Sequence, residues 1–213
     1  MIRACLRQTG HEIVDFRPRT HWFADWEALL KRVATPDLVW VPCFRQRDVL
    51  AAARWARRKG VPLVFDPLIS AWDKRVLEFG KVSAASSAAH RLLEQERRQF
   101  AAADRFVIAA PLWDLSFPAQ LKVFLENIYV TGIVTKYSEA GKPVGLCRAN
   151  ELYYDTTSGG PFDGRIGYDY WKTIAQDCFG IPTVKLLEAE NLDIVGADAE
   201  KIVDDAIKAY GLA

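Results

Sequence analysis

A short apolar run, a loop between two prolines and an amphipathic helix follow one another in Ala103-Asp-Arg-Phe-Val-Ile-Ala-Ala-Pro-Leu-Trp-Asp-Leu-Ser-Phe-Pro-Ala-Gln-Leu-Lys122. The run Phe106–Ala110 is continuously apolar, as are strands of a parallel sheet that is covered on both faces. Ser116 and Pro118 are residue types that favour the start of a helix. The apolar side chains that follow recur at the helical period, at Phe117, Leu121, Phe124, Leu125 and Ile128. This segment therefore predicts a strand, a loop and a helix that packs on a sheet.

Short apolar runs alternate with amphipathic helices along the rest of the chain. Asp48 and Gly60 bracket one such helix, and a stripe from Ala199 to Tyr210 marks another. The alternation predicts a three-layer α/β/α sandwich, Rossmann-like, with right-handed crossovers and a mainly parallel sheet of about six strands. No Pro/Gly/Ser linker divides the chain, so we expect one α/β domain over residues 1–213. The predicted strands are Glu12–Phe16, Leu38–Val41, Leu63–Asp66, Phe106–Ala110, Leu152–Thr156 and Val184–Glu188.

Composition excludes several classes of protein. Half of the 213 residues are hydrophobic and 26% are charged, which is not the composition of a disordered chain. No apolar run approaches the roughly 18–20 residues of a membrane span. Residues 1–104 carry 18 Lys and Arg against 12 Asp and Glu. However, their densest basic cluster closes a predicted helix before Gly60, where cations complement the helix dipole, so we expect no nucleic-acid partner.

The cysteines and the N-terminus indicate the compartment. Cys5, Cys43, Cys147 and Cys178 have no CxxC or Cys/His ligand spacing, so we expect no metal site. The first residues have no long apolar segment and no cleavage site of the secretory kind. The expectation is a reduced, cytoplasmic protein.

Ligands of open α/β sheets bind in the loops beyond the carboxyl ends of the strands. No such loop here is a GxGxxG or GxxxxGK[ST] phosphate motif. The loops after Phe106–Ala110 and Leu152–Thr156 are the informative ones, because Trp113 offers a broad apolar face and Gly159 and Gly160 permit close approach to backbone amides. Together these loops form a candidate slot for a flat ring with hydrogen-bonding edges. In the alternative interpretation, Trp113 and Phe117 are core residues and the two glycines form a plain turn.

The second half of the chain resembles a known family. The segment Ala103–Lys122, Lys136-Tyr-Ser-Glu, Pro143-Val-Gly-Leu, Tyr153-Tyr-Asp-Thr-Thr-Ser-Gly-Gly and Phe179-Gly-Ile are similar to the flavodoxin-like, FMN-dependent NAD(P)H oxidoreductases of the azoreductase and quinone reductase group. The resemblance implies a flavodoxin-like fold, FMN as cofactor, NAD(P)H and a small-molecule electron acceptor as partners, and often a homodimer. It also implies that Pro111, Leu112, Trp113, Asp114 and Leu115 wrap the flavin ring, and that Ser158, Gly159 and Gly160 meet its pyrimidine side. The family commonly has Asn where this chain has Asp114.

Residues 1–104 resemble a different family. Gly10-His-Glu-Ile-Val-Asp, Pro36-Asp-Leu-Val-Trp-Val-Pro and Pro62-Leu-Val-Phe-Asp-Pro-Leu-Ile-Ser are similar to the N-terminal domain of GT-B glycosyltransferases. A change of resemblance inside one strand-helix unit suggests a recombined or engineered chimera without catalytic activity, which is the alternative to the oxidoreductase. A natural family distantly similar to both is a further alternative. The chimera predicts one continuous sheet in which strand Leu63–Asp66 neighbours strand Phe106–Ala110.

Other polar residues carry weaker hypotheses. No Ser-rich phosphate loop is visible, and Ser70 with Lys74 is the only substitute that the sequence offers. His11, His21 and His90 are interpreted as core or surface residues, and no catalytic side chain is assigned, because hydride transfer is the chemistry of the cofactor. The segment 128–137 is either a dimer interface or a buried helix end with an edge strand.

Overall fold

The computed structural model describes residues 6–7, 9–42, 45–66, 70–161 and 165–210. Its main helices are α2 (Ala24–Leu30), α3 (Val49–Lys59), α4 (Ser87–Ala102), α5 (Ala119–Ile128), α6 (Arg165–Thr173) and α7 (Ala199–Ala209). Shorter helical segments are η1 (Gln46–Asp48), η2 (Asp73–Glu78) and η3 (Ile174–Phe179). The strands are β1 (Val39–Val41), β2 (Leu63–Phe65), β3 (Arg105–Ala109), β4 (Thr135–Tyr137), β5 (Pro143–Gly145), β6 (Glu151–Thr157) and β7 (Thr183–Ala189).

The strands form a mainly parallel α/β structure, as the sequence predicts. β3, β6 and β7 pair in parallel in that order, β1 pairs in parallel with β2, and β4 and β5 form an antiparallel hairpin. Five of the six predicted strands are present. The sixth, Glu12–Phe16, is wrong: it has no regular structure, and Val14 is 61% exposed. Among the residues that the structure describes, the segment therefore has neither a partner strand nor a buried face.

The prediction of one continuous sheet is also wrong. Among the described residues β2 is hydrogen-bonded to β1 alone, and although it contacts β3 no ladder joins the two. β2 is only three residues long, so it offers few groups for pairing on its second edge. The chimera hypothesis required that continuous sheet and loses this support.

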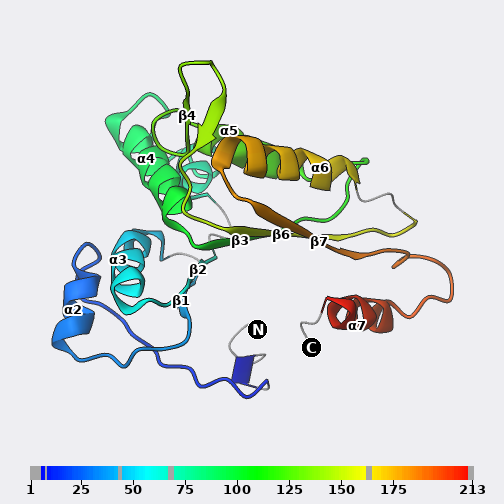
Figure 1. The fold of residues 1–213 in the computed structure, drawn as a ribbon, viewed down its shortest axis with the longest axis horizontal. Helices are drawn as coiled ribbons and strands as arrows, with labels where there is room; N and C mark the ends of the chain where they lie inside the picture. The colour runs from blue at the N-terminus through cyan, green and yellow to red at the C-terminus, as the bar shows by residue number, and fades with distance from the viewer. Residues whose placement is uncertain (1–5, 8, 43–44, 67–69, 162–164, 211–213) are drawn as a thin grey trace.

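Helices cover the two faces of the sheet unequally (Figure 1). α3 contacts α4 and α4 contacts α5, while α7 packs against β7 from the opposite side. The strand order β3–β6–β7 follows the chain, so right-handed crossovers place their helices on one face. The architecture is thus a flavodoxin-like three-layer α/β/α arrangement, and among the described residues α7 forms the second helical layer. This layer leaves part of the sheet exposed, since Val107 on β3 is 62% exposed.

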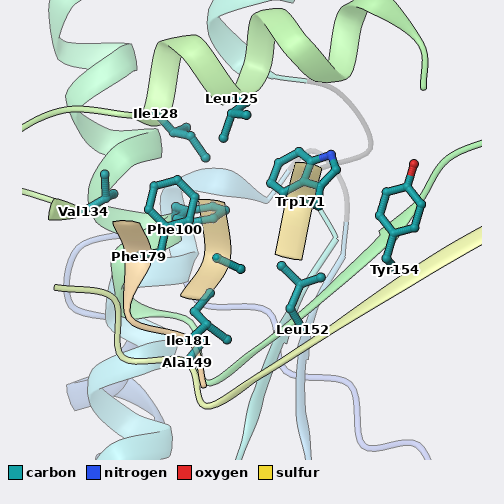
Figure 2. Packing of buried hydrophobic residues seen from close by; sticks show 11 residues of the cluster. Phe100, Leu125, Ile128, Val134, Ala149, Leu152, Tyr154, Trp171, Phe179 and Ile181 are labelled. Atoms are coloured by element: carbon teal, nitrogen blue, oxygen red, sulfur yellow. The ribbon is translucent and has the colours of Figure 1, made fainter. Parts of the chain in front are cut away.

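The main core lies between the β3–β6–β7 sheet and the helices above it (Figure 2). Trp171 on α6 is fully buried beneath α5 and above Leu152. Ile128 and Val134 are also fully buried, which fits the buried alternative for the start of segment 128–137, whereas Tyr137 at its end is 54% exposed. The buried members are Phe100, Leu125, Ile128, Val134, Ala149, Leu152, Tyr154, Trp171, Ala175, Phe179 and Ile181.

The helix α3 shows how the sequence sets local structure. Gly60 ends it with a φ of 70°, a left-handed conformation that glycine adopts without strain. Asp48 precedes it as predicted, but the Asp48 carboxylate caps no backbone N–H and instead binds the His21 ring and the Arg45 guanidinium. No helix in the described part of the chain has the length and apolar composition that a membrane crossing requires.

Candidate functional site

The loops that follow β3 and β6 lie side by side. The two strands pair in parallel, with Ala109 opposite Asp155, so both loops leave the same edge of the sheet. Beyond the strands the backbone N–H of Leu112 donates to the carbonyl of Thr157 at 3.0 Å. The structure therefore brings the predicted segments Pro111–Leu115 and Ser158–Gly160 together.

The first loop is a tight two-residue turn. The backbone N–H of Trp113 donates to the Ser116 carbonyl at 2.8 Å, and the Ser116 N–H returns a bond of 2.9 Å. Asp114 and Leu115 between them have φ values of 50° and 65°, as a type I′ turn requires. Trp113 and Leu115 are 58% and 66% exposed, so the interpretation of Trp113 as a core residue is wrong. The same interpretation is confirmed for Phe117, which packs against the main core.

Hydrogen bonds of Ser158 fix the second loop. The Ser158 side chain is buried and donates from Oγ to the Gly160 carbonyl at 2.8 Å, while its backbone N–H bonds to Ala189. The two glycines differ in their surroundings. A methyl group on Gly159 would meet the carboxylate of Asp193, whereas Gly160 has open space where its Cβ would be.

These loops present unused hydrogen-bond donors. No described residue accepts a hydrogen bond from the backbone N–H of Asp114, Leu115, Gly159 or Gly160. Free amides beside the exposed ring of Trp113 suit a flat molecule with carbonyl oxygens on its edge. The ring-binding part of the predicted site thus fits a flavin.

A pocket of about 330 Å³ lies under the loops, between the carboxyl ends of β3, β6 and β7 and helix α7. Pro111, Thr157 and Ile207 are among its mostly apolar lining residues. Asp155 also lines it, and the buried Oδ1 atom of this residue has no hydrogen-bond partner among the described residues. Burial raises the pKa of the Asp155 carboxyl above its ordinary value of 3.8.

Replacing this carboxylate by a neutral amide is expected to stabilise the protein. A raised pKa in the folded state means that the contribution of Asp155 is most favourable below pH 3.8 and is lost as the pH rises from 3.8 through the folded-state pKa. Asp155→Asn should therefore raise the unfolding free energy by about 1 kcal/mol at neutral pH and change it little in acid. Urea unfolding at several pH values measures this. Asp204→Asn on the exposed side of α7 is the control, and an equal gain in both variants would contradict the argument.

The phosphate side of the predicted site is different. The Ser70 hydroxyl donates to both carboxylate oxygens of Glu96, at 3.1 and 2.9 Å, and the backbone N–H groups of Ala71 and Trp72 also donate to Glu96. Glu96 is buried, and burial raises the pKa of its carboxyl despite these bonds. The Glu96 carboxylate thus accepts the hydrogen bonds of the Ser70 hydroxyl and of the adjoining amides. The hypothesis that Ser70 binds the FMN phosphate in place of a phosphate loop is therefore wrong.

The remaining candidates supply no further chemistry. His11 and His90 are exposed, and the His21 Nδ1 lies 2.6 Å from Asp48, a partner that spacing alone did not reveal. Cys43 lies outside the described residues, and the thiols of Cys147 and Cys178 are free. Within the described ranges no three His, Cys, Asp or Glu side chains gather as a metal site.

Sequence reasoning missed Asp155 and Asp193. Asp155 did carry a signal, because it is the one charged residue inside the apolar run Leu152–Thr156. Asp193 carried none, since only the fold places it over Gly159.

Curated proteins similar to this chain share part of its length. It is 40% identical over 119 residues to the FMN-dependent NADH:quinone oxidoreductase of Clostridium perfringens, covering 54% of this chain and 59% of that protein. It is 44% identical over 115 residues to the protein of the same name from Coprothermobacter proteolyticus, covering 52% and 57%. The chain thus spans less than two thirds of the length of these relatives.

Solved structures and a family model agree on the fold. An azoreductase from Bacillus anthracis superposes with a TM-score of 0.53 at 17% identity, covering 82% of this chain and 96% of that one. An FMN-dependent NADH-azoreductase from the same species, solved with FMN, gives 0.53 at 18% identity, covering 82% and 95%. A family model described as flavodoxin-like fold matches residues 47–212, across the change of resemblance near Ala103. The chain therefore belongs to the family of the flavodoxin-like fold.

Proposed function

We propose that this protein binds FMN and acts as an NAD(P)H oxidoreductase that reduces quinones or azo compounds. The observation that carries the proposal is the pair of adjoining loops with free amides beside exposed Trp113. The 40% identity to a quinone oxidoreductase supports it, because the relative is named for both the cofactor and the reaction.

The residues of the two loops would have different roles. The amides of Asp114, Leu115, Gly159 and Gly160 would donate to the polar edge of the ring, with Pro111, Leu112 and Trp113 along its side. Ser158 would act as a positioning residue, since its hydroxyl is already bonded to Gly160. FMN, when bound, supplies the hydride chemistry, and the protein supplies orientation and a dry surface.

The partners follow from the same proposal. NAD(P)H and a small electron acceptor would approach the ring on the side that the chain leaves open. We also propose a homodimer, for which exposed Tyr137 on the β4–β5 hairpin is one accessible residue of segment 128–137. The free thiols of Cys147 and Cys178 support a cytoplasmic location.

Asp114 is the residue whose charge opposes the proposed ligand. A carboxylate beside the electron-rich edge of a reduced flavin is repulsive, and asparagine tolerates the same left-handed turn. Asp114→Asn should tighten FMN binding by about tenfold, equal to roughly 1.4 kcal/mol. A fluorescence titration measures the affinity, with Asp177→Asn on the surface as control. An unchanged affinity would place the ring elsewhere.

The proposed activity is tested by following NADH oxidation with a soluble naphthoquinone and added FMN. FMN-dependent turnover that falls at least about tenfold in Trp113→Ala supports the proposal. One observation favours the alternative of a folded protein without catalysis: Glu96 occupies the amides of Ala71 and Trp72. Turnover no faster than FMN alone would favour that alternative. The likeness of residues 1–104 to a glycosyltransferase domain stays a prediction.

A further inference from the structure

A second pocket, of about 300 Å³, is lined by residues from the first half of the chain, among them residues that follow β1 and β2. Four segments far apart in the chain meet there, namely His21, the η1 region, the start of η2 and the middle of α4. Loops beyond the carboxyl ends of parallel strands are where open α/β sheets bind ligands. The lining residues are His21, Arg45, Gln46, Arg47, Ala71, Arg75, Leu92, Gln95 and Glu96.

Three arginines give this arginine pocket its chemistry. Arg45 is paired through its Nε with the Asp48 carboxylate at 2.5 Å. The side chains of Arg47 and Arg75 are exposed and form no ion pair or hydrogen bond with any described residue. Two guanidinium groups with unused planar donors are suited to an anion that presents several oxygens.

The acidic groups of the pocket do not neutralise these cations. The Glu96 carboxylate is saturated by the Ser70 hydroxyl and the amides of Ala71 and Trp72, and it pairs with no arginine of the described chain. Asp48 is engaged by His21 and Arg45. The charge of Arg47 and Arg75 is therefore available to a ligand.

Hydrogen bonds within the protein preorganise the pocket for a ligand. The side-chain amides of Gln95 and Gln99 both donate to the Gln46 carbonyl, which fixes η1, with Arg47 inside it and Arg45 just before it, on α4. Glu96 fixes the start of η2, one turn before Arg75. A site built in advance loses less entropy on binding.

We propose that the arginine pocket binds a phosphate monoester, the phosphate group of a small phosphorylated molecule. Arg47 and Arg75 donate to its oxygens, and Arg45 and His21 form the adjoining wall. The volume lies at the small end of ligand pockets, which fits a molecule of modest size. This site is separate from the loops proposed for the flavin ring and does not depend on that function.

Calorimetry with AMP, adenosine and inorganic phosphate tests the proposal without any flavin. AMP and phosphate should bind and compete, adenosine should not, and added salt should weaken the binding of AMP. Arg47→Gln and Arg75→Gln should each reduce AMP affinity about tenfold or more. Both side chains are on the surface, so circular dichroism should show intact folds, and Arg47→Lys should retain part of the affinity because it keeps the charge.

Arg57→Gln on α3 is the matched control, because Arg57 is exposed and does not line the pocket. Equal losses in Arg57→Gln and the pocket variants, or adenosine binding as tightly as AMP, would overturn the proposal. FMN and riboflavin titrations of the Arg47→Gln variant identify the source of the phosphate. A loss for FMN alone assigns the pocket to the phosphate of FMN, whereas no loss for FMN, with AMP weakened, assigns it to a separate ligand.

Discussion

Replacement of Gly145 by alanine is expected to destabilise the folded chain severely. A Cβ at this position of β5 would stand well inside 3.0 Å of the backbone of Phe179 and Gly180, where real Cβ atoms essentially never stand. The clashing atoms belong to the main chain at the end of η3, which cannot change its conformation as easily as a flexible side chain. The same crossing is fixed by a hydrogen bond from the Cys147 N–H to the Phe179 carbonyl at 3.2 Å.

The cost of that substitution should exceed about 4 kcal/mol, which is a large part of the stability of an ordinary domain. Urea unfolding followed by circular dichroism measures it. Gly160→Ala is the matched control, because nothing lies within 4 Å of its Cβ position, and it should change stability by less than about 0.5 kcal/mol. A Gly145→Ala protein that unfolds at the midpoint of the unsubstituted chain would contradict the packing of β5 on η3.

Truncation of Trp171 should have the next largest effect. The side chain is fully buried in the main core (Figure 2). Its ring centroid lies 6.2 Å from that of Phe117. Trp171→Ala removes these contacts and leaves a cavity under α5, for which a loss of about 3–5 kcal/mol is expected. Trp171→Phe should lose much less, because the Trp171 Nε1 has no hydrogen-bond partner in the described chain and the ring is partly retained.

The comparison with Trp113 separates burial from residue type. Trp113→Ala removes a ring that is 58% exposed, so unfolding in urea should change by less than about 0.5 kcal/mol. Similar losses for the two alanine variants would mean that Trp171 does not lie at the centre of the core.

The sequence predicts the parts of this fold that local pattern determines. Short, largely apolar runs located β3, β6 and β7, and Gly60 marked the end of α3. The hairpin β4–β5 was missed because each strand has three residues, too few to show a period. Glu12–Phe16 was wrong because a strand also needs a neighbour, which its own residues do not reveal.

The site was predictable to the same extent. The rule that ligands bind beyond the carboxyl ends of strands selected the loops at Trp113 and Gly159, and the parallel pairing of β3 with β6 places these loops together. The contact between Ser70 and Glu96 joins residues 26 positions apart, so no local sequence pattern predicts it. The close approach of Gly145 to Phe179 is likewise a property of the packed chain.

The most direct test of the flavin proposal is a titration of the purified protein with FMN, followed by flavin fluorescence and visible absorbance. Saturable binding with quenched flavin emission is expected, and it should weaken about tenfold in Trp113→Ala, a variant whose fold is expected to be intact. The absence of binding at high FMN concentration, with the protein shown to be folded, would contradict the assignment of the loops at Trp113 and Gly159 to a flavin.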